Sequence, residues 1–430
     1  MISGKLKIQK SAIPQYFLIY VMLLLPGSCA VARYLNETAV YTVILLLHLL
    51  LALIYKKYRS RYVLSFIFFF LAVTLFVRLK THGGVGIISW LRYAAIFSSI
   101  YLAIAINNHF FLKRVVQLTV VLAVISLVFW AIFCLFPSLV EIWPAAVYWT
   151  QDMGTGEWAI SYYGKGLWIY SYLQIHATRN CGIYTEPGVY QCVLNAVLFI
   201  LLFWKEELHF RTEKQYKISV LIILAALISC QSTTGYIGLL LILCFFFIFR
   251  IHKDSATKKV KRYILSLVVV GIAIIFIDYF VNGTDSILYK QVIYKFFGST
   301  VGEGLNLSEG TGRARLGTII VSLMAILKDP FGIGYTEFTL MKNAFDKALV
   351  AASFASFAAV YGIIPWVITL AFLIIPVFGK MRRRLAVLWC LLFINTTLAQ
   401  TYLLFPGLIL FPIYLATTNN YGMKRKLSDG

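Results

Sequence analysis

Long apolar runs dominate the chain and recur at short intervals along its length. A helix needs about 20 mostly apolar residues to cross a hydrocarbon core about 30 Å thick. Twelve runs approach this length, and we interpret them as transmembrane helices at about 13–34, 38–55, 62–77, 85–106, 115–137, 187–204, 218–232, 235–250, 263–281, 352–378, 385–400 and 402–418. The pattern therefore predicts an all-α polytopic membrane protein with about 12 transmembrane helices in a single membrane domain over residues 1–430.

One further apolar run, LGTIIVSLMAIL at 316–327, has only 12 residues. That length suits an interfacial or buried helix better than a span. Counting the run as a span would also move the basic stretch KMRRR (380–384) to the outer side, unless 348–378 were split in two. We therefore place residues 316–327 in an extracytoplasmic loop.

The distribution of charge supports this arrangement of spans. The chain has a formal net charge of +22, and the segments expected to be cytoplasmic hold 26 of its 39 Lys and Arg residues but only five of its 17 acidic residues. Short cytoplasmic loops of membrane proteins are rich in Lys and Arg. The basic excess thus indicates topology, with both termini cytoplasmic, and a nucleic-acid-binding function is not needed to explain it. We interpret the first run as a retained helix and not as a signal peptide, because no small-residue cleavage pattern follows it.

Composition excludes the soluble class and the disulfide-rich class. Hydrophobic residues make up 60% of the chain and charged residues 13%, whereas soluble domains have about 25% charged residues. The seven cysteines are odd in number and form no CxxC pair. Neither a disulfide framework nor a metal site is therefore predicted.

Two extracytoplasmic loops, at about 138–186 and 282–351, are far longer than simple connectors require. Long loops in compact proteins are usually functional or disordered, and the varied composition of these two favours function. The first loop is rich in aromatic residues: Trp143, Tyr148, Trp149, Trp158, Tyr162, Tyr163, Trp168, Tyr170 and Tyr172. Such rings stack on sugar faces and donate hydrogen bonds from their polar tips. An aromatic belt at the membrane interface is the alternative for each ring.

The first loop ends in ATRNCGIYTEPGVYQ (177–191), where Thr185 or Glu186 is expected to cap a helix that begins at Pro187. Glu186 would then lie at the outer mouth of the sixth span, with Arg179 seven residues earlier. A fixed carboxylate in this place can accept a proton from a sugar hydroxyl, and an arginine beside it can hold phosphate. The alternative is a helix cap with a surface ion pair, which contributes about 0–1 kcal/mol.

Other candidate polar residues lie in the second loop and inside the spans. Arg313 and Arg315 follow a glycine-rich stretch at a predicted helix start, where guanidinium and backbone N–H groups can bind an anion such as diphosphate; a solvated helix end is the alternative. Arg92 lies inside the fourth span, where it either has a function or extends to the outer interface. A further set of polar residues in the spans can bond between helices: Asn195, Thr233, Thr234, Asn395, Thr396 and Thr397.

Three ordered stretches, RNCGIYTEPGVY (179–190), ISCQSTTGYIGLLL (228–241) and TGRARLGTIIVSLMAILKDPFGIGYTEF (311–338), precede YGIIPW (361–366). This order resembles the bacterial O-antigen polymerase and O-antigen ligase superfamily, with its Wzy-type polymerases and WaaL-type ligases. The resemblance implies a GT-C-like membrane fold in the bacterial plasma membrane. It also implies glycosyl transfer at the outer face without metal or cofactor. The donor would be an undecaprenyl-diphosphate-linked oligosaccharide, and the product O-antigen, capsule or exopolysaccharide. A chain-length regulator and a flippase are the expected protein partners.

The resemblance also implies roles for individual residues. Arg313 and then Arg315 match the outer-loop arginines that bind diphosphate, and Arg179 and Glu186 fall in a stretch seen in many polymerases. We therefore expect Glu186 and Arg313 to be catalytic. The expected substrate-binding residues are Arg179, Arg315, Thr233, Arg92 and Tyr184.

Two departures favour a polymerase over a ligase. Many ligases have Ser-Arg at the turn where this chain has Ser232-Thr233, and ligases tend to have a histidine in a stretch that here, from Glu337 to Tyr361, has none. A ligase that transfers the same glycan to another acceptor remains the nearest alternative. A polysaccharide transporter or flippase is the alternative of another class, and it would predict internal repeats around a midplane site.

Overall fold

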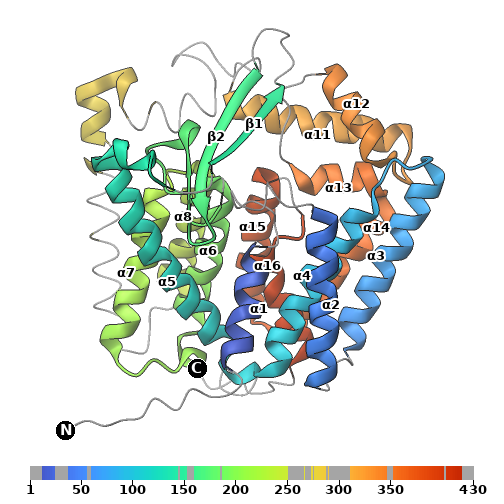
Figure 1. The fold of residues 1–430 in the computed structure, drawn as a ribbon, viewed down its shortest axis with the longest axis horizontal. Helices are drawn as coiled ribbons and strands as arrows, with labels where there is room; N and C mark the ends of the chain where they lie inside the picture. The colour runs from blue at the N-terminus through green and yellow to red at the C-terminus, as the bar shows by residue number, and fades with distance from the viewer. Residues whose placement is uncertain are drawn as a thin grey trace.

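The structure is a computed structural model that describes residues 12–24, 37–55, 60–143, 146–152, 159–184, 186–249, 266, 273–274, 276–286, 289, 310–345, 352–400 and 403–418. Within these residues the chain is mostly helical, with helices side by side and a small sheet at one end (Figure 1). The expected helical character of the chain is confirmed, since helices dominate the part of the chain that the structure describes.

The helices of the bundle follow most of the predicted spans. They are α1 (Ala12–Leu24), α2 (Glu37–Ile54), α3 (Arg61–Lys80), α4 (Ile87–Ile106), α5 (Asn108–Leu135), α6 (Pro187–Phe203), α7 (Glu213–Ser229), α8 (Thr233–Phe249), α14 (Ile363–Lys380), α15 (Arg383–Ala399) and α16 (Pro406–Thr417). Among the described helices, α3, α4, α5 and α14 are long and apolar enough to cross a membrane, and several others are apolar but shorter. The helices thus suit a membrane-embedded protein, while the expected count of about 12 spans stays a prediction.

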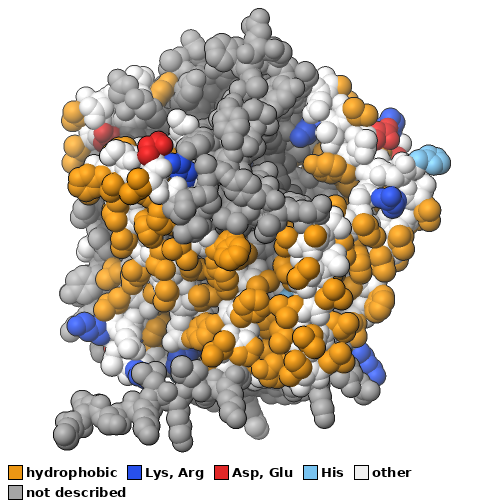
Figure 2. Space-filling model, in the orientation of Figure 1, with side chains coloured by type: hydrophobic (Ala, Val, Ile, Leu, Met, Phe, Trp, Pro, Cys, Tyr) orange, Lys and Arg blue, Asp and Glu red, His pale blue; other side chains and the backbone are white. Residues whose placement is uncertain are grey.

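The segments predicted to share one side of the membrane contact one another. At the end of the bundle with the sheet, called here the sheet end, the backbone N–H of Ser353 donates to Gln400 O at 3.1 Å, and that of Tyr335 donates to Gly84 O at 2.7 Å. At the opposite end, called the basic end, Lys113 Nζ donates to His209 O at 3.0 Å, and Lys380 Nζ donates to Thr418 O at 2.8 Å. Figure 2 shows hydrophobic side chains across the middle of one face, with the described Lys and Arg side chains nearer its upper and lower edges.

The aromatic-rich loop contains an antiparallel sheet, so the all-α expectation is wrong for this segment. Its strands are β1 (Ala146–Asp152), β2 (Ala159–Leu167) and β3 (Tyr170–Leu173), in the order β1-β2-β3. Tyr148 lies opposite Tyr163 across β1 and β2. Tyrosine, tryptophan and isoleucine favour strands because their side chains fit a pleated, half-buried surface. The tight turn at 168–169 joins β2 to β3 and brings them into register.

Several aromatic rings of this loop form a core and do not line a binding surface. Tyr170 is buried, and its ring lies 5.5 Å from that of Phe129 in α5. The Trp143 ring is 4.4 Å from the same phenylalanine. Packing rather than sugar contact therefore explains Trp143 and Tyr170, whereas Trp168 remains 53% exposed. The side chains of Tyr148, Trp149, Trp158, Tyr162 and Tyr163 lie outside the described residues.

The run predicted as one span at 352–378 is split into two helices, which corrects that interpretation. α13 (Ser353–Tyr361) ends at Gly362, whose φ is +98°, and α14 begins at the next residue. The short apolar run at 316–327 lies within α11 (Gly310–Lys328), which is followed by α12 (Gly334–Phe345). In Figure 1, α11 and α13 lie crosswise to α3 and α14 at the sheet end.

The turn between α11 and α12 packs directly on the break between α13 and α14. The N–H of Ile333 donates to Ala359 O at 3.0 Å, and the N–H of Ile363 donates to Pro330 O at 2.9 Å. The backbones approach so closely that a Cβ on Gly332 would lie 2.7 Å from Val360 O. Since φ is also positive at Gly332 and Gly362, only glycine fits this crossing without strain.

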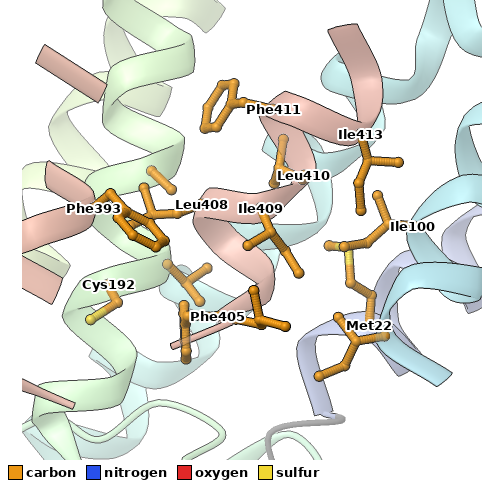
Figure 3. Close-up of a cluster of buried hydrophobic side chains, with 14 of the residues drawn as sticks. Met22, Ile100, Cys192, Phe393, Phe405, Leu408, Ile409, Leu410, Phe411 and Ile413 are labelled. Atoms are coloured by element: carbon orange, nitrogen blue, oxygen red, sulfur yellow. The ribbon is translucent and has the colours of Figure 1, made fainter. Parts of the chain in front are cut away.

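Helix α16 lies at the centre of the bundle. The predicted span 402–418 contains only this 12-residue helix, whose residues Pro406 to Leu415 are buried. Figure 3 shows its side chains Leu408 to Phe411 among residues of neighbouring helices that include Met22, Ile100, Cys192 and Phe393. A helix that is apolar on all sides is stable when protein surrounds it. The helix therefore forms a central part of the core, packed against α4, α6 and α14.

Candidate functional site

Residues of both predicted outer loops contact the segment where α7 ends and α8 begins, at the turn of residues 230–232 and the first turn of α8. Ser232 begins the entry to α8, since its hydroxyl accepts a hydrogen bond from Gly235 N at 3.4 Å. The preceding Gln231 has a φ of +47°, which makes the turn tight. The first turn of α8 presents backbone N–H groups and the positive end of the helix dipole. This turn is therefore a favourable place for a negatively charged ligand.

Residues 176–184, called here the strap, run across this turn. The backbone N–H of Asn180 donates to Ser229 O at 2.9 Å. The carbonyl of Thr178 accepts from Trp130 Nε1 at 2.9 Å and from Gln231 Nε2 at 3.3 Å. These bonds fix the last part of the first long loop on α5, α7 and the turn.

Arg179 is half-buried between the strap and the turn. Its Nε donates to Cys230 O at 3.2 Å, and one of its terminal nitrogens lies 3.3 Å from His176 Nδ1. Burial lowers the pKa of Arg179, and nearby groups that include Glu186 partly oppose this shift. An arginine nevertheless stays charged at physiological pH. Among the described residues no carboxylate lies within ion-pair distance of this guanidinium, so its charge is available to an anionic ligand.

Arg315 reaches the first turn of α8, directly after this turn, from the second long loop. It lies on α11, and its Nη2 donates to the hydroxyl of Thr234 at 3.3 Å. The carbonyl of Thr234 accepts from Asn395 Nδ2 of α15 at 3.0 Å. Burial lowers the pKa of Arg315, which in the described part of the chain has no ion-pair partner either. Two guanidinium groups from distant parts of the sequence thus contact neighbouring segments, Arg179 the α7–α8 turn and Arg315 the first turn of α8. As half-buried charges they favour an anionic ligand.

Glu186 lies beside this pair, at the start of α6. It occupies the N-cap position with Pro187 as the first helical residue, as the sequence predicts, but its side chain makes no capping hydrogen bond. The side chain is exposed, and its charge is among those that partly offset the burial-induced lowering of the Arg179 pKa, so the two groups interact electrostatically. A carboxylate that is exposed and does not cap its helix can serve as a proton acceptor.

The other predicted site residues fall in different places. Arg313 lies in the first turns of α11, but its side chain is outside the described residues. Thr233 is half-buried at the start of α8, and it is the neighbouring Thr234 that bonds Arg315. Tyr184 is buried with its ring against that of Tyr190, at 6.0 Å between centroids, which does not fit the expected contact with substrate.

Arg92 is placed at another interface, between α2 and α4. Its Nε donates to the Tyr41 hydroxyl at 3.1 Å, and its guanidinium lies over the same ring at 5.6 Å from the centroid. It also interacts with Tyr361 at the end of α13. These contacts do not join Arg92 to the turn that holds Arg179 and Arg315.

Sequence reasoning missed the polar residues that hold the site together. Asn180, Ser126 and Ser229 are buried, and the Asn180 amide donates to both serine hydroxyls. Asn180 stands directly after a predicted site residue, but a single asparagine in a loop gives no signal of burial. The other two are ordinary serines in apolar spans, so only the contacts between elements identify this group.

Comparison with known proteins adds no relative. Among the described residues no three His, Cys, Asp or Glu side chains cluster as a metal site would require. No protein-family model, curated protein or solved structure matches this chain. The site is therefore characterised by its own residues, which are two arginines and a carboxylate near the start of α8.

Proposed function

We propose that this protein is a membrane glycosyltransferase that polymerises undecaprenyl-diphosphate-linked oligosaccharide repeat units at the outer face of the bacterial plasma membrane. The observation that supports this best is that Arg179 contacts the turn between α7 and α8 while Arg315 contacts the first turn of α8 that follows it. Both guanidinium groups are half-buried. A diphosphate has the charge and the oxygen geometry to bind both at once.

The two arginines have a direct role in such a reaction. Transfer of the glycan breaks the bond between the sugar and the diphosphate, so negative charge develops on the leaving group. Preorganised cations at that point stabilise the transition state, and this electrostatic effect is usually the largest contribution to catalysis. Arg313, two residues before Arg315 on α11, is the further cation that this mechanism expects.

Glu186 supplies the second element of the mechanism. The acceptor is a sugar hydroxyl, which becomes a better nucleophile when a base takes its proton. The exposed carboxylate of Glu186, which interacts electrostatically with Arg179, is the candidate base that we assign to the site. The proton passes from the acceptor hydroxyl to Glu186 as the new glycosidic bond forms and the lipid diphosphate leaves.

The placement of charge supports an outward-facing site. Basic residues concentrate in the turns expected to be cytoplasmic, and under the positive-inside rule this favours an extracytoplasmic sheet end. A lipid-linked donor that has crossed the membrane presents its diphosphate at that face. A flippase upstream and a chain-length regulator are the protein partners that we expect for this function.

The test uses the purified protein in proteoliposomes with undecaprenyl-diphosphate-linked oligosaccharide and no nucleotide sugar. Arg315→Ala should lower kcat/KM by about 10²-fold or more, the usual effect of losing a transition-state contact. Arg315→Lys should recover only part of this loss, because lysine keeps the charge but not the forked geometry. Arg383→Ala is the matched control, since Arg383 is exposed at the basic end.

Each outcome of this test has a clear meaning. Longer lipid-linked chains made by the parent protein and not by Arg315→Ala support the proposal. Unchanged polymer length and yield in Arg315→Ala would remove the diphosphate role from this residue. Transfer to a different acceptor, with no chain growth, would identify a ligase instead.

A further inference from the structure

The side chain of Asn180 is buried in the strap at 0% exposure, and its polar groups are all engaged. Its Nδ2 donates to Ser126 Oγ at 3.1 Å and to Ser229 Oγ at 3.0 Å. Its Oδ1 accepts from the backbone N–H of Gly182 at 2.9 Å. With the backbone bond to Ser229, one asparagine joins the strap to α5 and α7. A residue with no exposed surface does not touch substrate.

The partners of Asn180 are themselves fixed. The Ser126 hydroxyl lies 3.0 Å from that of Tyr190 on α6, and both side chains are buried. Gly182 presses on the ring of Tyr190 with a φ of +59°, and a Cβ there would lie 2.8 Å from the ring. Three helices therefore hold the strap through a buried polar network. Such a network defines orientation, because hydrogen bonds, unlike apolar contacts, are directional.

Arg179 directly precedes this anchored residue. With Asn180 directed into the bundle, the backbone on either side of it has a fixed register. Arg179 then extends to the carbonyl of Cys230 at 3.2 Å. Without the hydrogen bonds of Asn180, the strap is no longer held on α5 and α7. Arg179 then loses its contact with the turn, although Arg179 itself is not substituted.

We propose that Asn180 is a positioning residue, which holds Arg179 at the α7–α8 turn and so determines the geometry of the anion site. The activity test of this inference depends on the proposed function, and a second test does not. Ser126 and Ser229 belong to the same device, because each accepts one of the two hydrogen bonds that the amide donates.

The first test is a double-mutant cycle in the proteoliposome polymerisation assay. If Asn180 acts through Arg179, then Asn180→Ala lowers kcat/KM by about 10-fold in the parent and less than about twofold in an Arg179→Ala background. Asn195→Ala is the matched control, since Asn195 is a buried amide that donates to Gln191 Oε1 and Gly235 O, neither of which belongs to the strap. Its effect should be the same in both backgrounds. Equal effects of Asn180→Ala in the two backgrounds would overturn the inference.

The second test needs no activity and uses the neighbouring thiol of Cys181. Cys181 is 1% exposed, and burial raises its pKa to about 12, so it should resist a maleimide at pH 7.5. For this test, four other cysteines of the chain are first replaced by serine, namely Cys29, Cys134, Cys244 and Cys390. Peptide mass spectrometry then measures labelling of Cys181 in Asn180→Ala, Ser126→Ala and Ser229→Ala. Asn195→Ala is again the control.

Labelling of Cys181 in the strap variants, but not in Asn195→Ala, supports the inference. Full protection of Cys181 in all three strap variants overturns it. Each serine variant keeps the asparagine and removes one of the two acceptors of its amide, so these variants remain informative where Asn180→Ala does not fold. If Arg179→Ala retains full activity, the proposed role of Arg179 fails. The labelling result then decides separately whether Asn180 holds the strap.

Discussion

The indole Nε1 of Trp389 in α15 donates a hydrogen bond to the carbonyl of Leu408 in α16 at 3.2 Å. Four residues after Leu408, Pro412 lacks the N–H that would normally bond this carbonyl. The same arrangement occurs in α14, where Pro376 leaves the Phe372 carbonyl to accept from the Tyr62 hydroxyl of α3. Each interior proline is tolerated because a neighbouring aromatic side chain satisfies the carbonyl that the proline leaves unpaired.

Trp389→Phe should destabilise the protein by about 1–3 kcal/mol, the usual loss when a buried carbonyl is left unsatisfied. In a Pro412→Ala background the loss should be smaller, because the alanine N–H can bond Leu408 O within the helix. Unfolding in detergent, followed by circular dichroism, measures both effects. Equal losses in the two backgrounds would mean that lost ring packing, and not the hydrogen bond, accounts for the change.

Gly332→Ala and Gly362→Ala should each destabilise the protein by about 1–3 kcal/mol or more, because positive φ strains an L-residue. In addition, a Cβ at either position would lie under 3 Å from backbone atoms of the facing segment. Gly379→Ala is the control, since nothing lies within 4 Å of its Cβ position. Because Gly379 lies in α14, where alanine favours the helix, Gly379→Ala should leave the stability unchanged or raise it slightly. Thermal unfolding compares the three variants, and a similar result for all of them would contradict the tight crossing.

Asp329 should make stability depend on pH in the acid range. Burial opposes ionisation, but the hydrogen bond and charge of Lys80 and the N–H of Phe331 outweigh it, so the pKa of Asp329 is lowered. A carboxyl whose pKa is lower in the folded state stabilises the protein above its unfolded pKa of about 3.9. This stability is lost as pH falls through the folded-state pKa.

Asp329→Asn tests that expectation, because the amide can still accept from Phe331 N while it loses the ion pair with Lys80. The difference in unfolding free energy between parent and variant should be about 0–1 kcal/mol at pH 7, as for exposed ion pairs. It should shrink towards zero as pH drops below about 4. A difference that does not change over this range would assign the effect to something other than the carboxylate.

Glu186→Gln should lower kcat by about 10²–10⁴-fold if the carboxylate is the general base. KM for the lipid-linked donor should change little, because the arginines of the site remain. Glu186→Asp keeps the carboxylate on a shorter side chain and should retain part of the activity. Initial rates of chain growth in proteoliposomes measure all three proteins. A Glu186→Gln variant with parent-like kcat would leave Glu186 without a catalytic role.

The apolar pattern predicted most helices because a long apolar run has few alternatives to a membrane helix. It did not predict the break at Gly362, since the reason for the break is the backbone of the α11–α12 turn, which is remote in sequence. It also missed β1 to β3. Their aromatic residues are spaced too irregularly to separate strand from loop, and pairing between strands decides the outcome.

The sequence by itself determined the helical character, the basic turns and the candidate cations Arg179 and Arg315, because composition, run length and charge are local properties. Only the tertiary structure decided that Arg179 contacts the α7–α8 turn and Arg315 the first turn of α8, that Tyr184 is in the core and that Asn180 is bonded to α5 and α7. Each of these depends on contacts between residues far apart in the chain. The directions of such contacts are determined by packing, which no local pattern encodes.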